Sequence, residues 1–220
     1  MKTTKIIFLL GTAGSGKDTV GRMFVNKGYT RVSFADTLKE EYANHLGIDV
    51  SLLHKQGPQK EKLRAGIIKY AEDKKKTDPL IWLNKAFEKH RDTNGQFKDG
   101  IKLVVTDFRR DCEVDWYYNL WEQIQEYEFH EELHKKKKHP IDLRMFYINR
   151  DTTDKDPLTH FTVGKVHGIN KVHQGFIDAV IHNNEIVGSN PDGVPTDAEY
   201  EEMKVALQKK IDRLFLIFNL

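Results

Sequence analysis

Two stretches of the chain are apolar enough to be strands buried on both faces of a sheet. They are Lys5–Leu10 and Ile101–Asp107, and their near-continuous apolar character is typical of parallel strands covered by helices on both sides. Shorter β-rich runs predict further strands. These runs are Tyr29–Phe34, Leu143–Ile148 and Phe176–Ile181.

Apolar residues that recur every three or four positions predict helices between these strands. The predicted helices are Asp18–Asn26, Ala35–Leu46, Glu113–Tyr127 and one that follows the capping box Thr196–Glu199. Asp78-Pro79 predicts one more helix start, because Asp can cap a helix and Pro fits its first position. The segment Ser51–Ile68 has a helical composition interrupted by Gly57-Pro58, so its structure stays open.

This alternation of strands and helices predicts an α/β fold, a doubly wound parallel sheet of about five strands with helices on both faces. Ligands of such sheets bind at the carboxyl ends of the strands. Residues that follow the predicted strands are therefore the first candidates for chemistry.

A glycine-rich loop directly follows the first predicted strand. It runs Gly11-Thr12-Ala13-Gly14-Ser15-Gly16-Lys17-Asp18-Thr19 and fits the P-loop pattern G-x-x-x-x-G-K followed by a polar pair. Glycines let the backbone fold tightly so that its N–H groups point at phosphate oxygens, and the following helix adds partial positive charge. Lys17 can reach the β- and γ-phosphates of a nucleotide. The alternative is a glycine turn with no ligand.

The residue after the P-loop lysine departs from the usual Ser or Thr, whose hydroxyl binds Mg²⁺. Here it is Asp18, followed by Thr19. A carboxylate can also serve Mg²⁺ through water, so we expect Asp18 to lie near the metal or the acceptor. The alternative is an acidic residue in the first turn of a helix, stabilised by the helix dipole.

Charged residues also follow the other two strands that we expect at this edge. Asp107 can orient Mg²⁺ through water, or it can cap the next helix. Arg109, Arg110 and, in a helical stretch, Arg64 can bind phosphate through their guanidinium groups or form surface salt bridges. After the second strand, Asp36 is either an acceptor or metal-water contact or a helix cap, and Lys39 can touch phosphate.

Composition excludes several classes of protein. The chain has 220 residues, 31% of them charged, with a net charge of +2, so we expect neither nucleic-acid binding nor a membrane partner. The single cysteine, Cys112, rules out a disulfide within the chain and suggests a reducing compartment. No signal peptide or membrane span is evident, which predicts a cytoplasmic protein. Monomer and homodimer both stay open.

Taken together, these motifs resemble the deoxynucleoside monophosphate kinases of bacteriophages, relatives of the dephospho-coenzyme A kinases within the P-loop fold. The resemblance lies in the loop, Phe34-Ala35-Asp36 with Leu38-Lys39, Asp78-Pro79, Thr106–Arg109 with Glu113-Val114, and Asp178 with Asn183-Asn184. After Arg109 the family usually continues with an aromatic residue, Pro and Asn, whereas this chain has Arg110-Asp111-Cys112.

The resemblance implies one kinase domain over 1–220 that uses ATP and Mg²⁺. It implies a helical acceptor-binding insertion at 37–100 and a lid at 150–175, and it implies that a deoxynucleoside monophosphate is phosphorylated to the diphosphate. We expect catalysis by Lys17, Asp18, Asp36 and Arg109; ATP contacts from Gly11, Ala13, Gly14, Ser15, Gly16, Lys17, Asp18, Thr19, Asn183 and Arg150; acceptor contacts from Asp36, Lys39, Arg64, Arg109 and Glu113; and Mg²⁺ at Asp18 and Asp107. Two alternatives are a kinase of another small acceptor, such as a coenzyme or a sugar, and a nucleotide-binding ATPase or switch.

Overall fold

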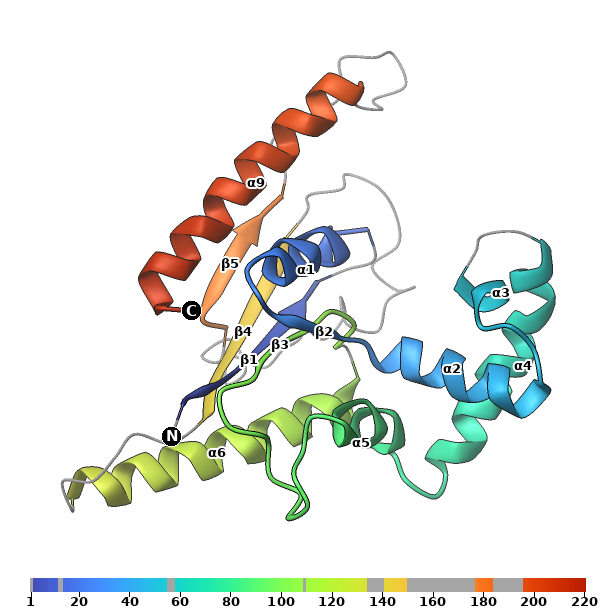
Figure 1. Cartoon of the computed structure of the whole chain (residues 1–220), viewed down its shortest axis with the longest axis horizontal. Helices are drawn as coiled ribbons and strands as arrows, with labels where there is room; N and C mark the ends of the chain where they lie inside the picture. Colours follow the sequence, from blue (N-terminus) through green and yellow to red (C-terminus); the bar gives the residue numbers. More distant parts are fainter. Residues whose placement is uncertain are drawn as a thin grey trace.

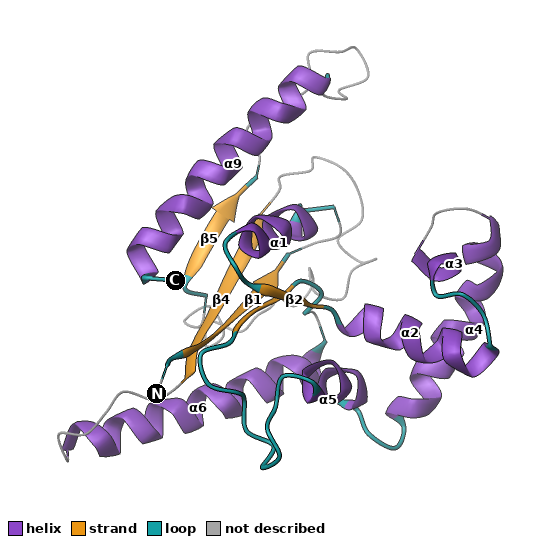
Figure 2. Cartoon of the chain, viewed as in Figure 1, coloured by secondary structure: helices purple, strands orange, loops and turns teal. Residues whose placement is uncertain are grey.

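The strands predicted from the sequence form one sheet, in which every pair of neighbours is parallel (Figures 1 and 2). A computed structural model describes residues 2–11, 14–54, 58–108, 110–133, 141–149, 177–183 and 196–220. The strand order is β2-β3-β1-β4-β5. The strands are β1 (Thr4–Leu10), β2 (Thr30–Val32), β3 (Lys102–Val105), β4 (Ile141–Asn149) and β5 (Ala179–His182). The predicted fold, a doubly wound parallel sheet of the P-loop NTPase type, is confirmed.

Helices connect the strands and cover the sheet. Those before β3 are α1 (Lys17–Asn26), α2 (Phe34–Leu46), α3 (Ser51–His54), α4 (Pro58–Lys75) and α5 (Ile81–Glu88). Those after β3 are α6 (Asp111–Leu133) and α9 (Asp197–Phe218). The predicted capping box is present at the start of α9, where Thr196 and Glu199 exchange side-chain and backbone hydrogen bonds.

The central strand β1 shows why the sheet is covered on both faces. Ile6 and Phe8 belong to an apolar cluster with α5 and α6, whereas Ile7 and Leu9 belong to another with α1 and α9, and all four are fully buried. Successive side chains of a strand point to opposite faces, so a continuously apolar strand needs helices on both sides. Figure 1 shows this arrangement, with α1 and α9 on one side of the sheet and α5 and α6 on the other.

Helices α2, α3 and α4 extend away from the sheet between β2 and β3 (Figure 1). They share a small apolar cluster of their own around Tyr42, Ala43 and Leu53. This region lies within the segment that we assigned to an acceptor-binding insertion, and that role stays a prediction.

Several element boundaries differ from the sequence-based expectation, and those of β2, β3, β4 and β5 differ by one to three residues. Asp78-Pro79 forms a turn in which the Asp78 carboxylate accepts from the Leu80 N–H at 2.9 Å, and α5 begins only at Ile81. The ambiguous segment after Ser51 is helical on both sides of residues 55–57, as α3 and α4. Helix α6 is longer than predicted at both ends.

The predicted lid at 150–175 and the lysine run Lys135–Lys138 lie outside the described residues.

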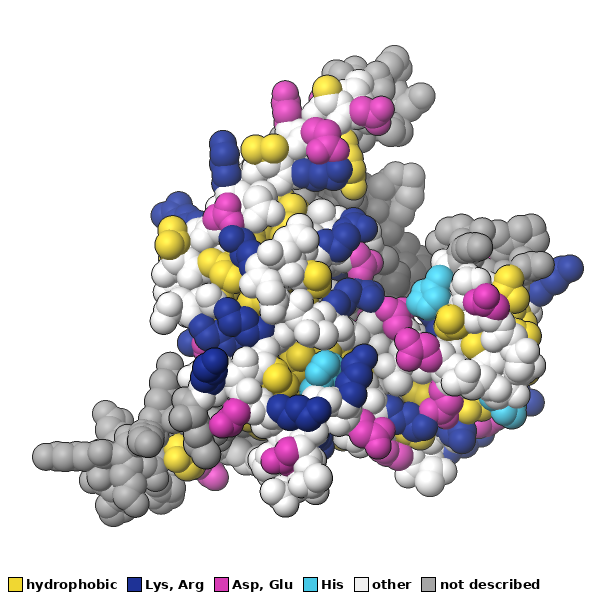
Figure 3. All heavy atoms as spheres, in the orientation of Figure 1, with side chains coloured by type: hydrophobic (Ala, Val, Ile, Leu, Met, Phe, Trp, Pro, Cys, Tyr) yellow, Lys and Arg dark blue, Asp and Glu magenta, His cyan; other side chains and the backbone are white. Residues whose placement is uncertain are grey.

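The surface carries charges of both signs, in keeping with the large share of charged residues and the small net charge of the chain. On the face drawn in Figure 3, basic and acidic side chains are interspersed. Within the described ranges, no helix combines the length and the apolar character needed to cross a bilayer.

Gly21 lies where α1 crosses closely over the end of β3. A Cβ atom added there would stand 2.5 Å from Cγ2 of Thr106. In an exposed helix, Gly→Ala stabilises by about 1 kcal/mol, but here we expect Gly21→Ala to destabilise the fold by about 1–3 kcal/mol because of this overlap. Urea unfolding measures the change. The double variant with Thr106→Ser, which removes the clashing methyl group, should recover most of the loss; no recovery would contradict this packing argument.

Candidate functional site

The glycine-rich loop begins at the carboxyl end of β1 and adopts backbone angles that favour glycine. Gly11, Gly14 and Gly16 have φ values of 148°, 72° and 96°. A Cβ at Gly11 would also stand 2.5 Å from the carbonyl oxygen of Ile148 in β4, so the loop passes directly against the neighbouring strand. Gly11 therefore requires glycine for both conformation and space, whereas Gly14 requires it for its backbone conformation alone.

Helix α1 starts at this loop without a side-chain cap. Its N-cap residue, Gly16, forms no side-chain hydrogen bond to the first turn, whereas Ser33 and Thr196 cap α2 and α9. The hydroxyl of Ser15 in the same loop is fully buried and, within the part of the chain that the structure describes, has no hydrogen-bond partner. Backbone N–H groups of a glycine-rich loop and of the helix start that follows it are the groups that bind phosphate, so the loop fits a nucleotide.

Lys17 and Asn183 both contact the loop backbone. Lys17 Nζ donates to the carbonyl oxygen of Gly11 at 2.6 Å, so its charge lies over the loop. Asn183 follows β5, and its Nδ2 donates to the carbonyl oxygen of Ser15 at 2.9 Å. The sequence placed Asn183 near the nucleotide, and the fold brings it to the loop. Ala13 and Arg150, also expected at the nucleotide, lie outside the described residues.

An arginine that the sequence analysis did not single out links the loop helix to the neighbouring strands. Arg31 of β2 pairs with Asp36 at 2.6 Å and with Asp18 at 3.6 Å, and its Nε donates to Thr106 Oγ1 at 3.1 Å. Asp18 is otherwise open to solvent, with 77% of its side chain exposed. Arg31 thus contacts one residue at the start of α1, one that follows β2 and one that follows β3. These are Asp18, Asp36 and Thr106, and all three lie at one edge of the sheet. Arg31 lies in the middle of the predicted strand Tyr29–Phe34, where no local pattern marks it as a site residue.

Asp36 is a paired carboxylate at the start of α2. Besides Arg31, it accepts from Lys39 Nζ at 3.0 Å, and His54 Nδ1 lies at 3.8 Å. Burial raises the pKa of Asp36, but the hydrogen bonds from Arg31 and Lys39 outweigh it, so the pKa is lowered. Two residues predicted for the acceptor, Asp36 and Lys39, therefore lie together at this edge, and the Asp36 carboxylate is ionised at neutral pH.

The lowered pKa of Asp36 makes part of the stability pH-dependent. Its stabilisation is present above the unfolded-state pKa of about 4 and is lost as the pH falls through the lower folded-state pKa. We expect Asp36→Asn to lower the free energy of unfolding by about 1 kcal/mol at pH 7, and the difference should shrink steadily as the pH falls below about 4. Urea unfolding at a series of pH values measures it, with the exposed Asp73→Asn as control. A difference that stays constant as the pH falls below about 4 would contradict the pairing.

Asp107, which follows β3, binds the start of α2. Its carboxylate accepts from the backbone N–H groups of Phe34 at 3.0 Å and Ala35 at 2.6 Å, and from the hydroxyl of Ser33 at 3.0 Å. One alternative from the sequence was that Asp107 caps the next helix, α6. These contacts run instead to α2, much earlier in the chain, because β2 and β3 are adjacent parallel strands. A role in Mg²⁺ binding stays a prediction.

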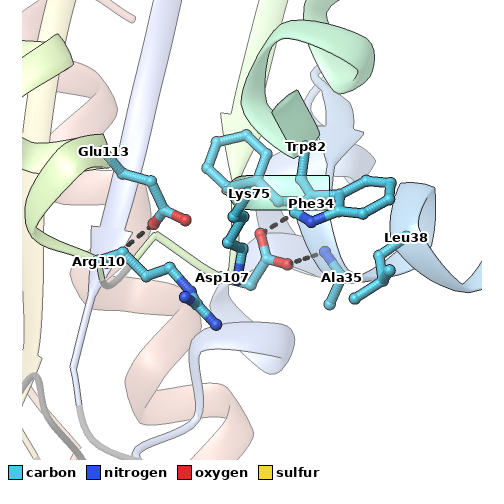
Figure 4. Close-up of a pocket in the computed structure, with 8 residues that line it drawn as sticks. All are labelled: Phe34, Ala35, Leu38, Lys75, Trp82, Asp107, Arg110 and Glu113. Atoms are coloured by element: carbon cyan, nitrogen blue, oxygen red, sulfur yellow. Dashed lines mark hydrogen bonds between the residues drawn. The ribbon is translucent and has the colours of Figure 1, made fainter. Parts of the chain in front are cut away.

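A pocket of about 60 Å³ adjoins Asp107, as Figure 4 shows. It is lined by Phe34, Ala35, Leu38, Lys75, Trp82, Asp107, Arg110 and Glu113, from α2, the end of α4, α5 and the start of α6. The pocket is smaller than the ~300–1,000 Å³ of typical ligand sites, so it suits one small group rather than a whole nucleotide. Lys75 was missed because it lies in a run of three lysines, where a solvated helix end is the usual interpretation.

The remaining predicted acceptor residues lie in different surroundings. Glu113 is buried in the pocket wall and accepts from the Arg110 N–H at 2.9 Å, at the start of α6. Arg64 is largely exposed on α4 and pairs with Glu61 at 3.5 Å, and it does not line the pocket. Arg109 lies outside the described residues.

Comparison with known proteins gives one family. The family model described as phosphomevalonate kinase matches residues 9–123, which run from the end of β1 through the loop and the pocket into α6. A search of curated proteins finds no match. The matched region contains most of the described candidate residues, with Asn183 as the exception.

Proposed function

Since the chain belongs to the phosphomevalonate kinase family and is therefore a phosphotransferase, we propose that it transfers the γ-phosphoryl group of ATP to a phosphate monoester. We further propose that this acceptor is a deoxynucleoside 5′-monophosphate. One observation carries the proposal. The loop that follows β1 and the pocket beside Asp107, which follows β3, lie at the carboxyl ends of two paired parallel strands.

The loop supplies the donor site. Its glycine backbone, the uncapped start of α1 and Lys17 together provide N–H groups and a cation for the phosphates of ATP. Asn183, which contacts the Ser15 carbonyl, lies next to this loop and supports the proposed nucleotide contact there.

Mg²⁺ would be bound at this edge by the phosphates and, through water, by Asp18, whose exposed carboxylate fits an oxygen-preferring ion. When bound, the ion neutralises charge on the phosphates of ATP. Asp107 is a weaker candidate, because its carboxylate already accepts hydrogen bonds from the start of α2.

The pocket supplies the acceptor site. Lys75 and Arg110 can bind the acceptor phosphate, and the rings of Phe34 and Trp82 form its apolar wall. The indole N–H of Trp82 is buried and has no partner among the described residues, so it can donate to a polar group of the acceptor. Asp36 and Lys39 lie on α2 directly beside the pocket residues Ala35 and Leu38, and we assign them to the sugar and base of the nucleotide.

In the proposed reaction, an oxygen of the acceptor phosphate attacks the γ-phosphorus of ATP in line. One O–P bond forms, the bond from the γ-phosphorus to the β,γ-bridging oxygen breaks, and ADP leaves. The attacking oxygen is already anionic, so no general base is needed, and the protein acts by alignment and charge neutralisation. Lys17 neutralises charge on the phosphates of ATP, and Lys75 and Arg110 neutralise charge on the acceptor phosphate.

A coupled assay tests the proposal. ATP consumption is measured with each deoxyribonucleoside and ribonucleoside monophosphate, with dephospho-coenzyme A, and with phosphomevalonate, the acceptor in the family's name. We expect turnover with at least one deoxynucleoside monophosphate. Turnover with phosphomevalonate alone would keep the phosphate-monoester class and overturn the nucleotide acceptor. ATP hydrolysis that no acceptor changes would overturn the kinase proposal.

A further inference from the structure

The two cations of the pocket share one partner. Glu72, one turn before Lys75 on α4, accepts from Lys75 Nζ at 3.1 Å and from Arg110 Nη2 at 3.3 Å through the same oxygen, Oε1. One carboxylate oxygen between an ammonium and a guanidinium is the arrangement that an oxygen of a phosphate monoester would adopt there.

The two acids that line the pocket, Asp107 and Glu113, do not take this position between the two cations. Asp107 is bound by N–H groups at the start of α2, and Glu113 is bound by the N–H of Arg110. Both carboxylates therefore receive partial positive charge from backbone donors. Of the described acids, Glu72 is the one that forms ion pairs with both Lys75 and Arg110.

Burial differs sharply between Glu72 and Lys75. The Lys75 side chain is 12% exposed, and burial lowers its pKa despite the hydrogen bond that it donates to Glu72. The Glu72 side chain is 53% exposed. The cation is thus fixed in the pocket wall, whereas the carboxylate can turn into solvent with little loss of contact.

From this geometry we infer that Glu72, which lies beside the pocket and is not one of its lining residues, pairs with the two acceptor-phosphate cations in the empty protein, and that a phosphate monoester binds by replacing it as their partner. The inference rests on the proposed function, because it specifies how the acceptor pocket of that kinase is filled. A phosphate dianion can bridge Lys75 and Arg110 with more charge and more oxygens than the single carboxylate. Glu72 would therefore act as an internal competitor that favours dianionic acceptors over neutral or monoanionic ones.

Phosphate binding without turnover tests the inference. The full chain is first saturated with ADP, which fills the loop, and inorganic phosphate is then titrated by calorimetry. We expect Glu72→Gln to tighten phosphate binding about threefold to fivefold, because the competing surface ion pairs are lost. Lys75→Met should weaken it about tenfold or more, and Lys75→Arg should retain binding within about threefold.

The control is Asp73→Asn, one residue away on α4. Asp73 pairs with Lys76 at 2.7 Å on the exposed side of the helix, so this variant should bind phosphate as the wild type does. Unchanged or weaker binding in Glu72→Gln would overturn the inference, because Glu72 would then only position Lys75. Failure of ADP to bind at all would instead overturn the proposed function.

Discussion

Lys17→Ala should lower the rate of phosphoryl transfer by about 10²–10³-fold while leaving the fold intact. The lysine lies over the loop, with its Nζ 2.6 Å from the Gly11 carbonyl oxygen, and its charge is the one that the loop can place on the β- and γ-phosphates. Removing one preorganised group that stabilises developing charge costs a factor of this size. Single-turnover kinetics with ATP and the best acceptor of the panel measure the transfer step directly.

The matched control for this variant is Lys209→Ala, at an exposed position of α9 in the same chain. It removes an equal charge far along the sequence from the loop, so its transfer rate should equal that of the wild type. Circular dichroism should show the same unfolding midpoint for both variants within a few degrees. Transfer that survives Lys17→Ala within about tenfold would falsify the donor-site assignment.

Asp107→Ala should be the most destabilising substitution at the site. It removes a carboxylate that accepts from the Phe34 and Ala35 N–H groups and from the Ser33 hydroxyl, and it leaves donors unsatisfied at the start of α2. Hydrogen bonds to charged groups and helix caps are each worth about 1–3 kcal/mol, so we expect a loss of about 2–4 kcal/mol. The thermal midpoint should fall by about 5–15 °C, measured without Mg²⁺.

Two further variants separate this structural role from a metal-binding role. Asp107→Asn keeps one acceptor oxygen and should lose about half as much stability, and Asp99→Ala in an exposed loop should unfold like the wild type. A role for Asp107 in Mg²⁺ binding predicts a different result. Asp107→Ala would then match the wild-type stability in EDTA and require more Mg²⁺ for transfer, which would contradict the capping account.

Parts of the site that lie within a short segment could be predicted from the sequence. The loop from Gly11 to Thr19 is continuous, and its glycines, lysine and preceding strand are all read from one stretch of chain. Position at a strand end also indicated that Asp107 faces the site. The sequence allowed Asp107 to cap the next helix, whereas in the structure it binds the start of α2. Its partner Phe34 is 73 positions away in the sequence.

Parts of the site that depend on ion pairs between different helices and strands could not be predicted from the sequence. Arg31 and Lys75 carry no local signal, because a cation in a short strand or in a lysine run is usually a surface residue. Their roles come from contacts, with Asp36 in one case and with Glu72 and Arg110 in the other. Arg110 and Glu72 are 38 positions apart, and only the tertiary fold brings the end of α4 close to the residue that precedes α6.

The sequence by itself determined the layers of this protein, the phosphate loop and the edge of the sheet where chemistry is expected. Backbone hydrogen bonding and the burial of apolar side chains repeat over a few residues, so their pattern is visible in any short window of the chain. The tertiary structure decided which cation faces which acid and where the pocket opens. Ion pairs of this kind depend on the relative position of whole helices and strands. Packing of these elements sets that position, and the spacing of residues within one segment does not predict it.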